Sequence, residues 1–156
     1  MIELRKITED NVKACMNLSV EEEQKAFVAS NTNSLIDAYV ALNNDEPAKT
    51  YAIYANDSMV GFAMIGYFNE KYGPVDGEFY YLWRFMIDKA HQGKGYGKMA
   101  MEKIVEEVKE KPFGNSNYFV TSIEPSNIGA RKLYNSFGFK ETGMFEEKEE
   151  VLVFEM

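Results

Sequence analysis

The sequence predicts an α/β fold, with a mixed sheet of about six to seven strands flanked by about four helices. The first observation is the order of periodic segments, which is strand, helix, helix, strand, strand, strand, helix, strand, helix, strand. The second is composition, since 46% of the 156 residues are hydrophobic and a chain of this length buries a substantial core. The third is the lack of any repeat or low-complexity linker, so we expect residues 1–156 to form a single domain.

The N-terminal part is expected to hold a strand, two helical regions and a hairpin. Residues 1–7 alternate and predict the first strand, and capping residues from Thr8 onward predict a helix to about Leu18. Residues 19–44 are expected to be mostly helical, with an apolar face at helical spacing formed by Leu35, Ala38, Tyr39 and Leu42. Residues 50–67 predict two strands joined by a turn at Asn56, Asp57 and Ser58.

A long apolar strand and two strand–helix units are expected in the remainder. Residues 69–77 predict a loop and residues 79–88 a strand that is central in its sheet. The following helix shows an apolar face made by Met101, Ile104, Val105 and Val108. Residues 118–123 predict a strand, and Asn127 opens a helix that Gly138 ends as a left-handed cap. The last strand is expected at residues 151–154.

A glycine loop joins the central strand to the helix after it, with the sequence Gln92-Gly93-Lys94-Gly95-Tyr96-Gly97. A helix start offers unpaired N–H groups and a partial positive charge, and glycines let a ligand approach the backbone closely. Residues 89–101 contain three lysines and no acidic residue, within an acidic protein. The loop therefore predicts a phosphate site rather than a plain flexible turn. Its glycine spacing fits neither a P-loop nor a dinucleotide fingerprint.

Charge and composition exclude several classes of function. The formal net charge of −8 disfavours nucleic-acid binding and favours a cationic small molecule, although acidity also serves solubility. Cys15 is the single cysteine and His91 the single histidine, so we expect no disulfide framework and no metal site. No apolar run reaches membrane-spanning length and no signal peptide is evident. We therefore expect a cytoplasmic protein with no membrane or nucleic-acid partner.

Two motifs carry a resemblance to the GNAT superfamily of acetyl-CoA-dependent N-acetyltransferases. The first is Gln92-x-x-Gly95-x-Gly97 after a strand that ends at Met86-Ile87-Asp88. The second is Asn127-x-x-Ala130-x-x-Leu133-Tyr134, followed by Gly138-Phe139, at the distance the family shows. The order of elements also resembles the GNAT fold along nearly the whole chain, which implies acetyl-CoA as the cofactor.

The resemblance implies roles for particular residues. Pantetheine would lie between two splayed strands against the backbone of Phe85, Met86 and Ile87, with Asn127 holding its arm. Tyr134 would be the general acid that protonates the leaving thiolate, although spacing alone indicates a core tyrosine. The diphosphate would lie on N–H groups of the loop, formed by Gln92, Gly93, Lys94, Gly95, Tyr96, Gly97 and Lys98.

The general base is left open by the sequence. Many relatives carry a glutamate on the central strand at the position that Trp83 holds here. Glu78 is the nearest upstream acidic residue on that strand, and a water relay or a backbone carbonyl are the alternatives.

One subfamily resembles the chain more closely, namely bacterial spermine/spermidine (diamine) N-acetyltransferases. The segment Glu23-Gln24-x-x-Phe27-Val28-Ala29-x-Asn31 and residues 82–87 carry this resemblance. A polyamine needs carboxylates along a groove, so Glu22, Glu23 and Glu78 are predicted substrate contacts, although an acidic run also suits a helix start. Trp83 is a further predicted contact, because its ring could stack on the alkyl or ammonium groups. The rivals are acetylation of another amine (an aminoglycoside, an amino acid or a protein N-terminus) and a non-catalytic acyl-CoA-binding module. A homodimer is a further expectation.

Overall fold

The computed structural model describes residues 1–156 as one seven-stranded sheet with helices on both faces. None of the helices is long and apolar enough to cross a membrane. The strands are β1 (Ile2–Arg5), β2 (Ala48–Ala55), β3 (Ser58–Tyr72), β4 (Val75–Ile87), β5 (Tyr118–Ile123), β6 (Lys140–Glu146) and β7 (Glu149–Glu155). The helices are α1 (Val12–Asn17), α2 (Asn31–Asn43), α3 (Tyr96–Lys109) and α4 (Ile128–Phe137), with 3₁₀ turns at Glu22–Gln24 and Lys89–His91.

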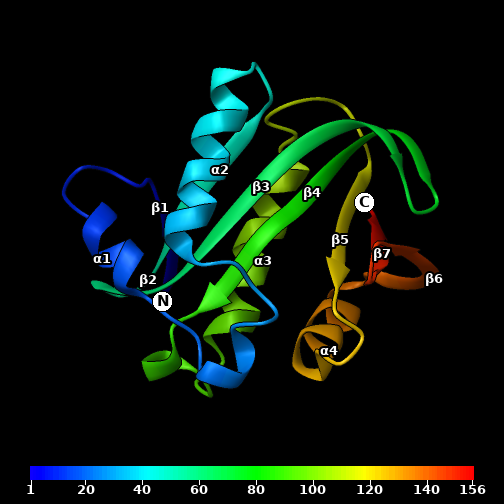
Figure 1. Cartoon of the computed structure of the whole chain (residues 1–156). Helices are drawn as coiled ribbons and strands as arrows, with labels where there is room; N and C mark the ends of the chain where they lie inside the picture. The colour runs from blue at the N-terminus through cyan, green and yellow to red at the C-terminus, as the bar shows by residue number, and fades with distance from the viewer.

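The strand order is β1-β2-β3-β4-β5-β7-β6, which puts β4 in the centre as predicted (Figure 1). Every neighbouring pair is antiparallel except β4 and β5. That parallel pair is short, since only Tyr80 with Phe119 and Tyr81 with Val120 are in register. Beyond Tyr81 the two central strands separate, so the sheet is divided into two parts that stay joined at one end.

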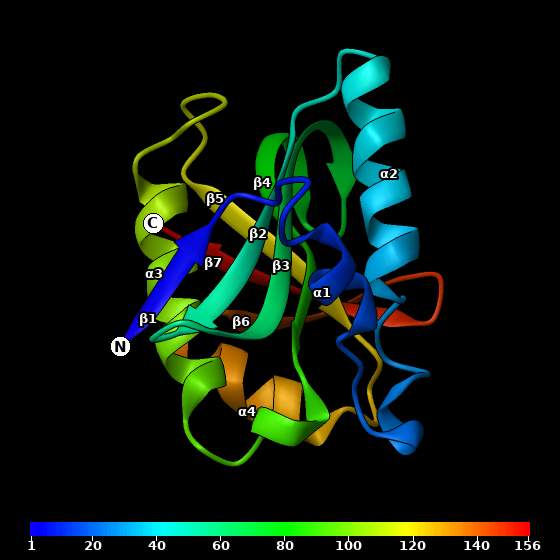
Figure 2. The same ribbon diagram turned by 90° about the vertical axis from the view of Figure 1, so that its left-hand side faces the viewer.

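Two apolar layers hold the helices to the sheet. The larger core lies under α3 and α4 and contains Met101, Ile104, Val105 and Val108, which confirms the predicted inner face of α3. The smaller core lies under α1 and α2 and includes Cys15 and Met86. Figure 2 shows α2 and α3 on opposite sides of the sheet, and Figure 1 shows α4 beside the separated end of β5.

A β-bulge in β4 explains why the central strands part. Ile65 of β3 pairs with Leu82, and its neighbour Met64 pairs with Arg84, so Trp83 is an extra residue on β4. A bulge bends its strand and reverses which residues face each side. Before it, Leu82 packs on the α3 side, whereas after it Met86 packs among the residues under α1 and α2.

One sequence prediction of local structure is wrong, one is incomplete, and one strand was not predicted. Residues 69–77 are not a loop, because β3 and β4 stay paired from Asn69 with Glu78 to Tyr72 with Val75, and only a tight turn remains. Residues 19–44 are mostly helical as predicted, but in two pieces, the 3₁₀ turn at Glu22–Gln24 and α2, with the non-helical residues 25–30 between them. Strand β6 was missed, since its residues are mostly exposed and lack an apolar pattern.

The predicted apolar face of α2 is also wrong in part. Tyr39 and Leu42 are exposed, and the buried face instead carries small or polar residues, namely Asn31, Ser34, Ala38 and Ala41. Small side chains let the helix approach β2 and β3 closely. The Nδ2 of Asn31 donates to the carbonyl of Cys15 at 2.8 Å, so this polar residue is satisfied in the core.

Candidate active site

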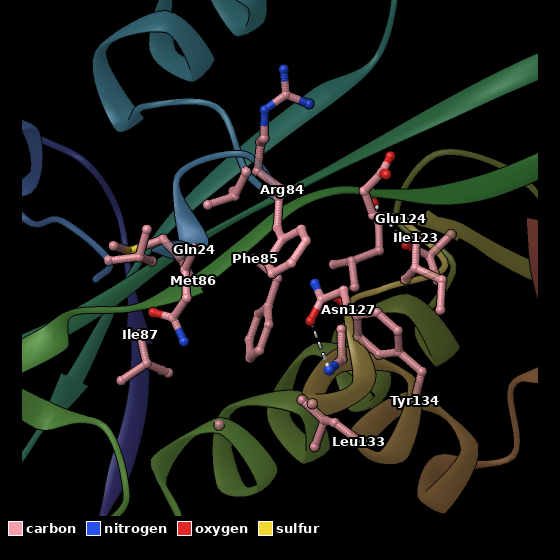
Figure 3. Close-up of a pocket in the computed structure, with 18 of the residues that line it drawn as sticks. Gln24, Arg84, Phe85, Met86, Ile87, Ile123, Glu124, Asn127, Leu133 and Tyr134 are labelled. Carbon is pink, nitrogen blue, oxygen red and sulfur yellow. Dashed lines mark hydrogen bonds between the residues drawn. The ribbon is translucent and has the colours of Figure 1, made fainter. Parts of the chain in front are cut away.

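A cavity of about 660 Å³ opens where β4 and β5 separate. Residues 81–87 of β4 form one wall, and residues 121–124 at the end of β5 form the facing wall. The start of α3 and the inner side of α4 form the floor, as Figure 3 shows with residues 85–87 on one side and Ile123 and Tyr134 on the other. The segment from Gln24 to Ala29 closes the remaining side. The cavity is therefore a product of the bulge in β4.

The glycine loop presents a row of free backbone donors at the mouth of α3. None of the N–H groups from residue 92 to residue 98 has a hydrogen-bond acceptor in the protein, whereas Met99 resumes the helical pattern by donating to Gly95. Gly93 and Gly95 have φ of 78° and 81°, values that L side chains rarely adopt. A Cβ atom on either glycine would meet nothing within 4 Å, so the space in front of the loop is open. Seven adjacent free donors at a helix start fit a diphosphate.

The side chain of Gln92 has a structural task of its own. Its Nε2 donates to Oε1 of Gln24 at 2.9 Å and to the carbonyl of Ile87 at 3.0 Å. Oε1 of Gln24 also accepts from the backbone N–H of Glu21 at 3.0 Å. Gln92 therefore ties the end of β4 to the segment that closes the cavity, while its backbone N–H and its side-chain Oε1 have no partner in the protein.

The predicted cofactor residues gather in this cavity, with two exceptions. Phe85, Met86, Ile87, Gln92, Gly93, Gly95, Tyr96, Gly97 and Asn127 line it. Lys94 and Lys98 do not line it but lie exposed on the same loop and helix start, without an ion-pair partner. Oδ1 of Asn127 accepts from the N–H of Ala130 at 3.2 Å and so caps α4, as the dashed line in Figure 3 marks.

Tyr134 both belongs to the core and lines the cavity. Its ring packs on Phe139 at a centroid distance of 5.6 Å, and 7% of the residue is exposed. No protein group hydrogen-bonds its hydroxyl. Burial raises the pKa of this hydroxyl well above its usual range, and the nearby carboxylate of Glu149 raises it further. The phenol is therefore held in its protonated form, in which it can donate a proton.

The predicted substrate contacts are only partly brought together. Trp83 lines the cavity, but Glu22, Glu23 and Glu78 do not. Glu22 is exposed and pairs with Lys25 at 2.7 Å, which lowers its pKa. Glu78 is exposed on β4, three residues before Tyr81, which is the first residue of that strand to reach the cavity.

Sequence reasoning missed the two carboxylates that do line the cavity. Glu124 follows the last residue of β5, and Glu149 is the first residue of β7. Since Ile123 pairs with Glu150, the register places Glu124 next to Glu149 across the two strands. Glu149 stands in a run of charged residues after β6, and nothing in that run distinguishes it from its exposed neighbours.

Comparison with known proteins identifies the family. The model of the acetyltransferase (GNAT) family matches residues 12–139. The chain belongs to the GNAT acetyltransferase family. This GNAT protein is therefore an acetyl-CoA-dependent N-acetyltransferase, as the glycine loop and the downstream motif predicted.

Two relatives of this GNAT protein match it over 99% of both chains. It is 34% identical to a probable spermine N(1)-acetyltransferase of Bacillus subtilis subsp. natto (strain BEST195). It is 33% identical to the spermine/spermidine N(1)-acetyltransferase of Bacillus subtilis (strain 168).

Solved structures show the same GNAT fold at low sequence identity. The spermidine N-acetyltransferase from Vibrio cholerae, in complex with CoA and spermine, superposes with a TM-score of 0.69 at 14% identity, over 97% of this chain and 92% of that one. An aminoglycoside acetyltransferase in complex with coenzyme A gives a TM-score of 0.75 at 17% identity, over 99% of this chain and 95% of that one.

Proposed function

We propose that residues 1–156 form one domain that transfers the acetyl group of acetyl-CoA to a primary amine of a polyamine such as spermine or spermidine. The amine attacks directly in a ternary complex. The observation that carries the proposal is a single cavity that is lined both by the glycine loop, with its row of free amides, and by two carboxylates without an ion-pair partner. The first feature suits a diphosphate and the second suits an ammonium group.

The coenzyme is held mainly by backbone groups in this proposal. Its diphosphate lies on the N–H groups of residues 92–98, and Lys94 and Lys98 add positive charge beside it. Its pantetheine arm runs along residues 85–87, where β4 has lost its pairing with β5 and its edge is free. The Nδ2 of Asn127 has no hydrogen-bond acceptor in the protein. It faces the same gap and holds the arm.

Tyr134 supplies the proton for the departing thiolate. It lies on α4 at the cavity floor, where its hydroxyl is protonated at neutral pH like any phenol, and burial raises its pKa further. A buried donor next to the developing sulfur charge stabilises the transition state more than water does.

A polyamine suits the acceptor end of the cavity, and the names of the two Bacillus relatives support this substrate class. Trp83 offers a ring to the alkyl and ammonium groups, while Glu124 and Glu149 offer negative charge. Glu22, Glu23 and Glu78 lie outside the cavity, so their proposed role is to attract the cationic substrate through the long-range field rather than by contact.

A homodimer and a cytoplasmic location belong to the same proposal. Strand β6 is an edge strand that exposes Met144 and Phe145, which a second copy would cover. The single buried thiol, Cys15, suits a reducing compartment.

Steady-state kinetics on a panel of amines tests the substrate class. We expect kcat/KM for spermine and spermidine to exceed that for lysine, putrescine and an aminoglycoside by at least about tenfold, or about 1.4 kcal/mol. Equal values for spermidine and lysine would refute the polyamine. Tight coenzyme binding with no turnover of any amine would instead show a non-catalytic acyl-CoA-binding module.

A further inference from the structure

Glu149 ends a chain of hydrogen bonds that crosses the sheet beside the cavity. Its Oε1 lies 2.6 Å from Oγ of Ser122 on β5. Oγ of Ser122 lies 2.6 Å from Oη of Tyr81 on β4, and Oη of Tyr81 lies 3.2 Å from Oη of Tyr72 on β3. Three of these four residues, Tyr81, Ser122 and Glu149, line the cavity.

The chain has a fixed direction. A carboxylate only accepts, so the hydroxyl of Ser122 must donate to Glu149. Oγ of Ser122 then accepts from Tyr81, and Oη of Tyr81 accepts from Tyr72. Burial and the neighbouring Tyr72 raise the pKa of Tyr81 far above its usual range, so this phenol stays a donor. One oxygen of Glu149 is therefore held in place by a hydrogen bond from the sheet.

The other oxygen of Glu149 has no partner in the protein. No lysine, arginine or histidine forms an ion pair with this residue. The groups around it are Tyr81 on β4, Tyr134 on α4, Glu124 after β5 and its cross-strand neighbour Glu146 on β6. An uncompensated carboxylate beside a second one calls for a cation from outside.

We propose that Glu149 is the general base of the reaction, and that Ser122 and Tyr81 are positioning residues that orient it. The assignment rests on the proposed function, and it names a base where the sequence left one open. Glu78, the nearest acidic residue upstream on β4, lies outside the cavity, whereas Glu149 shares the cavity with the proposed acid, Tyr134.

The proton and electron balance follows from these positions. The free oxygen of Glu149 takes a proton from the acceptor ammonium, and the freed nitrogen lone pair attacks the carbonyl carbon of the thioester. The carbon–sulfur bond breaks with its electron pair on sulfur, and Tyr134 protonates that thiolate. The new amide nitrogen gives its second proton back to Tyr134, and Glu149 releases its proton to water. One ammonium and one thioester thus give one amide, one thiol and one proton.

The decisive variant is Glu149→Gln, assayed as kcat and KM against pH from 7 to 10. Gln keeps an oxygen to accept from Ser122, so we expect the fold and the Kd for acetyl-CoA to stay unchanged. We expect kcat/KM at pH 7.5 to fall about 10²-fold or more. The kcat/KM of the variant should rise towards the wild-type value as pH increases, because a growing fraction of an amine with pKa near ~10 is then neutral without a base.

Ser122→Ala tests the positioning role. It should lower kcat several-fold and shift the pH profile in the same direction as Glu149→Gln, with an unchanged Kd for acetyl-CoA. Glu155→Gln, an exposed change on the same strand, is the matched control and should behave as wild type.

Three results would contradict the assignment of Glu149 as the general base. They are a wild-type kcat for Glu149→Gln, a rise in polyamine KM with unchanged kcat, and a loss that high pH does not relieve. The second would make Glu149 an ammonium anchor only. The assay uses whichever amine the wild type acetylates fastest, so a failure of the polyamine proposal would show separately, in the wild type itself.

Discussion

Tyr134 shows how one residue serves the core and the chemistry together. Its ring completes the larger core against Phe139, and its hydroxyl reaches the cavity without a protein partner. A buried phenol normally finds a partner, so a free one at a cavity wall points to a ligand. The sequence could show the helical position of Tyr134 but not the emptiness in front of its hydroxyl.

Tyr134→Phe tests the proton donor. The ring and its packing remain, so we expect unfolding free energy and the Kd for acetyl-CoA to change little, while kcat falls about 10²–10⁴-fold. Steady-state turnover with the best amine measures this. Tyr118→Phe, on an exposed residue of β5, is the control and should keep full activity. A wild-type kcat in a folded Tyr134→Phe protein would remove the acid role.

At the scale of elements, the loop before α3 depends on a backbone shape that only glycine adopts easily. Gly95 caps the helix at φ 81° in the left-handed region. We expect Gly95→Ala to lower the free energy of unfolding by ~1 kcal/mol through backbone strain alone, since the added Cβ meets no protein atom. Because that Cβ enters the space where the diphosphate would lie, the Kd for acetyl-CoA should rise about tenfold.

Gly129→Ala is the matched control for the stability part of this prediction. Gly129 is the second residue of α4, and a Cβ there would also meet nothing within 4 Å. The change should raise the free energy of unfolding slightly, because alanine loses less conformational entropy than glycine when it becomes helical. Urea titration and calorimetric titration with acetyl-CoA measure the two effects. An unchanged Kd in Gly95→Ala would place the diphosphate elsewhere.

Elements with strong periodicity were predictable, and those governed by distant contacts were not. The strand at residues 118–123, the inner face of α3 and the Gly138 cap with φ 102° follow from local patterns, and all are confirmed. The bulge at Trp83 leaves no mark in an apolar run, because apolar residues on both faces of a central strand hide a change of side.

The site shows the same division between local and distant information. The glycine loop is one continuous segment, so its sequence revealed it. Glu149 and Glu124 come together only through the pairing of β5 with β7. In the same way, α2 buries small residues because it packs against β2 and β3. Sequence reasoning chose Glu22 and Glu23 for their local acidity, whereas the register of two late strands decides which carboxylates reach the cavity.

At the scale of the whole molecule, the two parts of the sheet are joined by a few β4–β5 contacts and by buried tyrosines at that join. Tyr80 on β4 lies in the larger core, and its hydroxyl accepts from the N–H groups of Phe113 and Gly114 at 3.0 Å each. Tyr81 reaches the other way, to Ser122 on β5. Adjacent residues on one strand thus hold both faces at the point where the cavity begins.

Buried tyrosines of this kind also make the free energy of unfolding fall at alkaline pH. Burial raises the pKa of Tyr51, Tyr81 and Tyr134 well above the unfolded value of about 10, and burial raises the pKa of the Cys15 thiol to about 11. The unfolded chain releases these protons first, so it binds fewer protons than the native state. The stability that these groups contribute is fully present below the unfolded pKa values and is lost as pH rises through the folded ones.

We therefore expect the free energy of unfolding to fall steeply between pH 9 and 11, by roughly 1.4 kcal/mol per pH unit for each group ionised only in the unfolded chain. Tyr51→Phe removes one such group, which does not line the cavity. The hydroxyl of Tyr51 donates to Glu107 at 2.9 Å. Its urea-derived stability should fall less steeply with pH than that of the wild type, whereas Tyr118→Phe should keep the wild-type slope. Identical slopes for all three proteins would contradict the raised pKa of Tyr51, because a tyrosine that ionises equally in both states adds nothing to the pH dependence.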